Sequence, residues 1–248
     1  MTNKNKFYDE GIVLSYYSYK ENDKIVNVFT KNNGRMSLLA RGAMKPSSNF
    51  GGKIEPITRI EFLYSVGRGF PFMSEVKELS PYLKIKSSIK ILKQSLVLIE
   101  ILKKMYPEEK KDVLLYKMSK RYIDILNMDG VTKLLAEFLI LSFKLNVLNH
   151  EGLNFSIDIC NECGNTKSRF SMSASGEILC SRCIGNRNFT SVEPLRNDIE
   201  KLKNLNLKGI TDNFNENKFK LLKKIINLYF SLNTGVELLT EKMVKLKL

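Results

Sequence analysis

The chain has 248 residues, of which 40 are Lys or Arg and 26 are Asp or Glu, so its formal net charge is +14. Hydrophobic residues make up 43% of the chain, which supports one large or two small folded domains and excludes global disorder. The positive charge predicts a polyanionic partner, nucleic acid before an acidic membrane surface, although an AT-rich genome also produces Lys- and Asn-rich chains.

The sequence predicts no export signal and no membrane span. Its first residues are polar, and its most apolar stretch, residues 134–148, is too short to cross a bilayer and contains Glu137 and Lys144. We therefore expect a buried helix there and a protein of the reducing cytosol. In that compartment four cysteines are more typical of metal ligands than of disulfides.

Residues 1–80 are predicted to form a small β-barrel. Strand-like runs, rich in β-branched and aromatic residues, occupy five segments: 11–19, 24–30, 35–41, 57–66 and 70–77. Asn-Asn-Gly at 32–34 predicts a hairpin turn between the second and third runs. Five short strands favour an OB-fold, the five-stranded barrel that commonly binds single strands, but an SH3-like barrel fits the strand count nearly as well.

Residues 81–248 are predicted to form an α-helical domain, which makes the fold class α+β. Apolar residues recur at spacings of three and four from Ile85 to Leu102, and further helical runs cover 113–126 and 134–145. The last of these is apolar nearly all round and is therefore expected to be central. After a cysteine segment, residues 191–248 return to helical periodicity, with the Asn-rich stretch 204–217 as a loop or a short helix connection.

All four cysteines lie in a predicted insertion at about residues 157–188. They form two Cys-x2-Cys pairs separated by sixteen residues: Cys160, Cys163, Cys180 and Cys183. Two intervening residues let a tight knuckle direct both sulfurs to one metal, and two knuckles complete a tetrahedron with Zn–S distances near ~2.3 Å. The pattern predicts one structural Zn²⁺, because four thiolates leave no position for a catalytic water. An iron–sulfur cluster is the alternative.

The stretch between Asp23 and Glu55 contains no acidic residue, so it is the candidate DNA-binding region. Its cations can pair with phosphates, and an aromatic ring in its glycine-rich loop 42–53 can stack on bases, as can the tyrosines of residues 11–19. With a cation from the following Gly-Arg-Gly turn, the candidates are Lys31, Arg35, Arg41, Lys45, Phe50, Lys53 and Arg68. The alternative is a solvated hairpin whose charges bind nothing, with strand aromatics such as Tyr16 packed in the core.

The sequence offers no catalytic constellation. Its single histidine, His150, is expected at a helix end, and there is no P-loop, no GxGxxG and no nuclease-type carboxylate cluster. We therefore predict that the protein is not an enzyme. A zinc-ribbon enzyme, such as a nuclease or a tRNA-modifying protein, is the alternative.

The run FTKNNGRMSLLARGAMK, residues 29–45, resembles the N-terminal signature of the RecO family of DNA repair proteins. The opening Gly-Ile-Val-Leu at 11–14 and the order of barrel, helices, four-cysteine insertion and C-terminal helices resemble that family too. The resemblance implies an OB-fold that binds single- and double-stranded DNA and anneals complementary strands, including strands coated by single-strand binding protein. It also implies a complex with RecR that helps to load RecA at gaps.

Carried over residue by residue, the resemblance matches the family's basic barrel positions to Arg35, Arg41 and Lys45. The four cysteines match its zinc ligands, and some relatives lack them, so zinc is expected to be structural. The family's C-terminal region often has Tyr-His where this chain has Tyr229-Phe230, so no histidine role is expected there.

A second hypothesis makes the protein an interaction scaffold in which DNA binding is incidental. Four lysines of the first helical run would then form a groove for an acidic peptide, such as the C-terminal tail of single-strand binding protein: Lys84, Lys86, Lys90 and Lys93. Both hypotheses place the protein in the cytoplasm, the first at the nucleoid.

Overall fold

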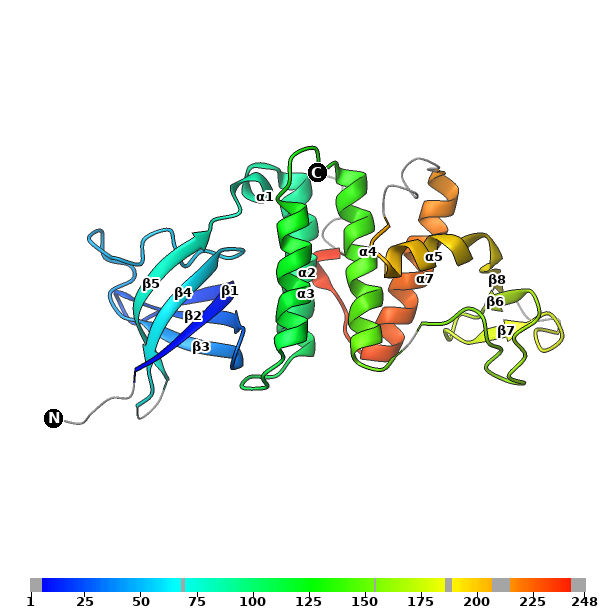
Figure 1. Cartoon of the computed structure of the whole chain (residues 1–248), viewed down its shortest axis with the longest axis horizontal. Helices are drawn as coiled ribbons and strands as arrows, with labels where there is room; N and C mark the ends of the chain where they lie inside the picture. Colours follow the sequence, from blue (N-terminus) through cyan, green and yellow to red (C-terminus); the bar gives the residue numbers. More distant parts are fainter. Residues whose placement is uncertain (1–5, 68–69, 154, 186–188, 207–214, 242–248) are drawn as a thin grey trace. The chain divides into compact units, whose positions relative to one another are not determined.

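The computed structural model describes residues 6–67, 70–153, 155–185, 189–206 and 215–241. The chain divides into two compact units, the first being Met1–Val131 with Leu238–Leu248 and the second Thr132–Glu237. Figure 1 shows the five strands of the barrel in blue to cyan, followed along the chain by the helices. The barrel shares the first unit with three helices, and the domain boundary expected at residue 80 stays a prediction.

The barrel is closed, with the strand order β1-β2-β3-β5-β4. Its strands are β1 (Lys6–Tyr19), β2 (Asp23–Thr30), β3 (Gly34–Ala40), β4 (Arg59–Ser65) and β5 (Phe72–Ser80). Neighbours pair antiparallel, except for a short parallel contact between β3 and β5 at Leu39–Ala40. The predicted OB-fold-like barrel is therefore confirmed.

Side-chain alternation explains which face of each strand is buried. In β3 every second residue points into the barrel, namely Met36, Leu38 and Ala40, while Arg35 and Ser37 face outward. The barrel interior is filled from all five strands and from the loop between β3 and β4: Val13, Val26, Val28, Phe50, Ile54, Ile60, Phe62, Tyr64 and Met73.

Three helices complete the first unit: α1 (Leu83–Ser87), α2 (Ile89–Met105) and α3 (Val113–Leu126). One continuous helix is expected from Ile85 to Leu102, but it is interrupted at Ser88, whose backbone is extended (φ −117°, ψ 106°). Serine competes for helix backbone groups and is favoured at helix ends, so a break there is physically consistent. Two contacts tie the helices to the barrel, because Tyr116 donates to Glu10 at 2.9 Å and Lys86 donates to Thr58 at 2.7 Å.

Glu100 on α2 fastens the last described residues of the chain. Its carboxylate accepts the backbone N–H groups of Leu239 and Thr240 at 2.8 and 2.9 Å and pairs with Lys104 at 2.8 Å. Burial alone raises the pKa of Glu100, but these donors outweigh it and lower the pKa to about 2. The ionised form is therefore the one that stabilises this contact.

We expect Glu100→Gln to remove a stabilisation that depends on pH. The folded pKa lies below the ordinary value of 4.5, so the stabilisation is complete above that pH and disappears as the pH falls toward about 2. Thermal unfolding of the wild type and the variant should differ near neutral pH and converge in acid. Glu21→Gln, which removes an exposed carboxylate from the β1–β2 turn, is the control. A stability difference that stays constant with pH would contradict this role.

The second unit contains α4 (Lys133–His150), the 3-10 helix η1 (Glu193–Leu195), α5 (Arg196–Lys203) and α7 (Glu216–Thr234). It also contains a three-stranded sheet, ordered β7-β6-β8, from β6 (Phe170–Met172), β7 (Ile178–Cys180) and β8 (Thr190–Ser191). Nearly every residue from Ala136 to Leu148 is buried, as predicted for a central helix. Part of the Asn-rich stretch, residues 207–214, lies outside the described residues. No helix in the described ranges is both long enough and apolar enough to cross a membrane.

Candidate metal centre and nucleic-acid interface

The four cysteines converge on one point. Their Sγ atoms all lie within 4.8 Å of one another, and the Cys163 and Cys180 Sγ atoms are 3.7 Å apart. That separation is too long for a disulfide, whose sulfurs lie about 2.05 Å apart. It matches the edge of a tetrahedron around one zinc ion, which Zn–S distances of ~2.3 Å place at roughly 3.8 Å. The cluster is therefore compatible with zinc.

Local backbone geometry directs the sulfurs inward. The carbonyl of Cys160 accepts the N–H of Gly164 at 2.9 Å, and the carbonyl of Cys180 accepts the N–H of Ile184 at 3.0 Å. A glycine at each knuckle has a positive φ: Gly164 at +68° and Gly185 at +54°. Glycine adopts this conformation at no steric cost, which explains why it follows each cysteine pair.

Backbone donors favour the thiolate forms that a metal binds. Burial raises the pKa of the Cys160 thiol, but N–H groups of Cys163, Cys180 and Glu162 lower it to about 6. The backbone N–H of Cys183 is the main cause that lowers the pKa of Cys180. Hydrogen bonding of the Cys183 thiol to the Cys163 sulfur, followed by burial, raises the pKa of Cys183. A bound cation would replace that proton.

The candidate DNA interface is the part of the outer face of β1, β2 and β3 that the helices leave uncovered, since Phe29 on this face is buried against Tyr106 and Tyr116. Arg35 is the second residue of β3 and faces outward, and Arg41 is exposed in the turn directly after the strand, where its guanidinium lies 5.3 Å from the Phe72 ring centroid. Between them, a polar row crosses three strands, because Asn27 bonds to Ser15 at 3.1 Å and to Ser37 at 2.8 Å. Arg35 and this polar row therefore lie on the same face of the sheet, followed by Leu39.

The remaining predicted cations are exposed or half-buried around the same barrel. Lys31 follows β2, and Lys45 is exposed in the loop after β3, where Met44 N–H donates to the Asn22 carbonyl in the β1–β2 turn. Lys53 is half-buried and its Nζ donates to the Asn49 carbonyl at 2.9 Å. Arg68 lies outside the described residues.

Phe50 is a wrong candidate for base stacking. Its ring is only 8% exposed and belongs to the barrel core, because the glycine-rich loop folds inward at this residue. The expectation that Tyr16 packs in the core is also wrong, because Tyr16 is 36% exposed and the Lys24 Nζ atom lies 3.6 Å from its ring centroid. Tyr17 is 48% exposed on the outer face of β1, whereas Ile25, its cross-strand partner in β2, is only 1% exposed.

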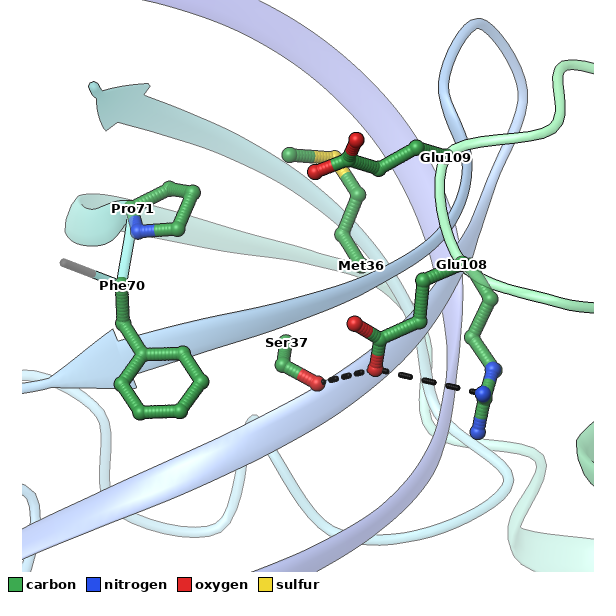
Figure 2. A pocket seen from close by; sticks show the side chains of 7 residues that line it. Met36, Ser37, Phe70, Pro71, Glu108 and Glu109 are labelled. Carbon is green, nitrogen blue, oxygen red and sulfur yellow. Dashed lines mark hydrogen bonds and ion pairs between the residues drawn. The ribbon is translucent and has the colours of Figure 1, made fainter.

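Sequence reasoning missed the acidic partner of Arg35. Glu108, from the connection between α2 and α3, lies 3.9 Å from the Arg35 guanidinium and 2.7 Å from the Ser37 hydroxyl. Figure 2 shows the Glu108 carboxylate beside Ser37 on the outer face of β3. No local signal identifies this contact, because the two segments are distant in the sequence.

Two family profiles match most of the chain. The profile described as "Recombination protein O N terminal" matches residues 3–82, and "Recombination protein O C terminal" matches residues 94–240. The chain belongs to the RecO family. A "DNA repair protein RecO" of Geobacter sulfurreducens is 28% identical over 177 residues, covering 70% of this chain and 71% of the relative. One from Listeria welshimeri is 25% identical over 247 residues, covering 95% and 92%.

RecO membership assigns the chain a role in DNA repair and recombination. The four predicted partner-binding lysines of this RecO protein do not form one row of free charges. Lys84 pairs with Asp129 at 2.7 Å, and Lys86 donates to Thr58. Lys90 is exposed on α2 and Lys93 is half-buried. Of the four, Lys86 is the one that lines an apolar groove beside α2.

Proposed function

We propose that this RecO protein is a recombination mediator that binds DNA through the outer face of β1, β2 and β3. It binds single- and double-stranded DNA, anneals complementary strands and, with RecR, helps to load RecA onto gaps coated by single-strand binding protein. The observation that carries the proposal is the placement of Arg35 on the outward face of β3 and of the exposed Arg41 in the turn directly after it, in an OB-fold-like barrel. No chemical turnover is part of this function.

The proposed contact is with the sugar-phosphate backbone. Arginine binds phosphate oxygens bidentately and releases condensed counterions, which supplies affinity without sequence preference. Hydroxyl and amide groups of Ser37 and Asn27 add neutral donors. The exposed ring of Tyr17 offers a stacking surface that accepts any base. A mediator that acts at arbitrary gaps needs this tolerance of sequence.

The same contacts explain annealing. A strand held by its phosphates keeps its base edges available, and neutralised phosphates repel an incoming complementary strand less. Zinc in the four-cysteine cluster would stabilise the second unit and would take no part in chemistry, because four thiolates close its coordination sphere. The barrel and the metal centre therefore have separate roles.

Annealing of coated strands tests the proposal. We expect the wild type to accelerate pairing of two complementary oligonucleotides that carry single-strand binding protein, measured by fluorescence resonance energy transfer between labelled ends. Arg41→Ala should slow this reaction, because Arg41 is exposed on the proposed face. Lys90→Ala, which removes an exposed charge from α2, is the matched control. Annealing no faster than the spontaneous reaction would refute the proposed function.

A second candidate function, docking of an acidic tail, is favoured by the groove beside α2. This cavity of about 830 Å³ is lined by apolar side chains, among them Leu83, Leu92 and Leu96, and by two lysines and two glutamates: Lys53, Lys86, Glu55 and Glu78. The apolar side chains and the two lysines would contact an acidic peptide such as the tail of single-strand binding protein, whereas Glu55 and Glu78 would oppose its charge. Binding of the labelled tail peptide to the wild type, weakened in Lys86→Ala, would support it.

A further inference from the structure

A short charged segment lies along the first residues of β3. Residues 107–111 connect α2 to α3, and the Glu109 N–H donates to the Arg35 carbonyl at 3.0 Å. The approach is so close that a Cβ at Gly34 would lie 2.2 Å from the Lys110 carbonyl oxygen. This backbone contact brings the Glu108 carboxylate over the outward face of the strand.

The groups around the Glu108 carboxylate are those that bind a phosphate. It accepts a hydrogen bond from the neighbouring Ser37 hydroxyl (Figure 2), at a distance of 2.7 Å. It lies 3.9 Å from the Arg35 guanidinium. A guanidinium beside a hydroxyl is a donor set typical of contacts to the nucleic-acid backbone. A carboxylate resembles a phosphate in charge and in its acceptor oxygens, so Glu108 can occupy such a position from within the chain.

The carboxylate satisfies Arg35 only in part. The distance of 3.9 Å is an ion-pair contact and is too long for a hydrogen bond. The Arg35 Nε atom is buried and has no hydrogen-bond partner among the described residues. Glu108 therefore leaves hydrogen-bonding capacity of the Arg35 guanidinium unused.

The structure also leaves room beside the carboxylate. A cavity of about 370 Å³ opens at the seam between β3 and β5, lined by Arg35, Met36, Ser37, Phe70, Pro71, Glu108 and Glu109. The Arg35 carbonyl accepts from Glu109, and the Leu39 N–H donates to the Pro71 carbonyl at 2.9 Å. Backbone groups alternate in direction along a strand. The N–H and C=O groups of Ser37, midway between Arg35 and Leu39, therefore point to the same side of β3 as the groups of those two residues.

We propose that Arg35 and Ser37 form a phosphate-binding position for the DNA backbone and that Glu108 occupies this position in the free protein. The inference rests on the proposed DNA-binding function and deepens it. DNA binds after a phosphodiester displaces the carboxylate. The apparent affinity for DNA is therefore lower when a larger fraction of the molecules has Glu108 in contact with Arg35 and Ser37. The Glu108 side chain is 48% exposed, which keeps the pair weak and the displacement easy.

Neutralising Glu108 tests the inference against a matched neighbour. Glu108→Gln should tighten binding of a fluorescein-labelled oligo(dT) by roughly three- to fivefold in fluorescence anisotropy, the range that loss of one exposed ion pair allows. Glu109→Gln removes the same charge from the next residue of the segment and should change binding far less. In an Arg35→Ala, Ser37→Ala background, Glu108→Gln should give no gain. Circular dichroism checks that each variant is folded.

The outcomes separate this inference from the proposed function. Equal gains in the two glutamine variants would show a general charge effect and overturn the inference, as would weaker binding by Glu108→Gln. In either case a loss of affinity in Arg41→Ala would leave DNA binding by the barrel supported. If the wild type does not bind the oligonucleotide, or if Arg41→Ala binds it equally well, the proposed interface itself fails.

Discussion

Replacing Cys163 by serine is expected to release the metal and to unfold the four-cysteine ribbon. The wild type should contain one zinc per chain by inductively coupled plasma mass spectrometry, and the variant should contain almost none. Structural zinc contributes about 10–16 kcal/mol to folding in zinc-finger peptides near neutral pH. The other contacts of this ribbon cannot compensate for the loss of that free energy. Limited proteolysis should then cut the ribbon in the variant and leave it intact in the wild type.

The size of the effect follows from the small core of the ribbon. Its strands bury few large side chains, namely Phe170, Met172, Ile178 and Leu179. Ser181→Ala, at an exposed position between the second pair of cysteines, is the control and should retain zinc. If the metal analysis finds iron instead of zinc and the protein absorbs visible light, the site holds an iron–sulfur cluster. Full metal occupancy in Cys163→Ser would remove Cys163 from the ligand set.

Removing both arginines of the barrel face is expected to have the second large effect. Arg35→Ala with Arg41→Ala should weaken binding of single-stranded DNA by roughly 10- to 100-fold at low salt, because two phosphate contacts and their counterion release are lost. Lys90→Ala with Lys93→Ala removes the same charge from α2 and is the matched control. Fluorescence anisotropy at one fixed salt concentration gives the comparison, and equal losses in the two double variants would indicate binding by net charge alone.

Side-chain periodicity made the barrel predictable. The alternation of Met36, Leu38 and Ala40 with outward polar residues reports the buried face directly, and the five strand-like runs coincide with the five strands. Cysteine spacing predicted the four-sulfur cluster for a similar reason, since both knuckles are local structures. Features that depend on a few neighbouring residues can be read from the sequence.

The errors come from contacts between distant segments. Phe50 lies in a glycine-rich loop and was expected to be accessible, but tertiary packing places it with Ala43 and Ile54 in the barrel core. Arg35 lies in a stretch without acidic residues, yet Glu108 reaches it from the α2–α3 connection. Neither the direction in which a loop folds nor a partner so far along the chain leaves a periodic signal.

The central claim is that outward cations of the barrel bind the DNA backbone. The salt dependence of single-stranded DNA binding tests it most directly, since each lost phosphate contact flattens the slope of log K against log salt by about 0.7. The account predicts that Arg35→Ala with Arg41→Ala lowers this slope by about 1.4 relative to the wild type. It also predicts an unchanged slope for Lys90→Ala with Lys93→Ala. Identical slopes for the wild type and the arginine variant would contradict the claim.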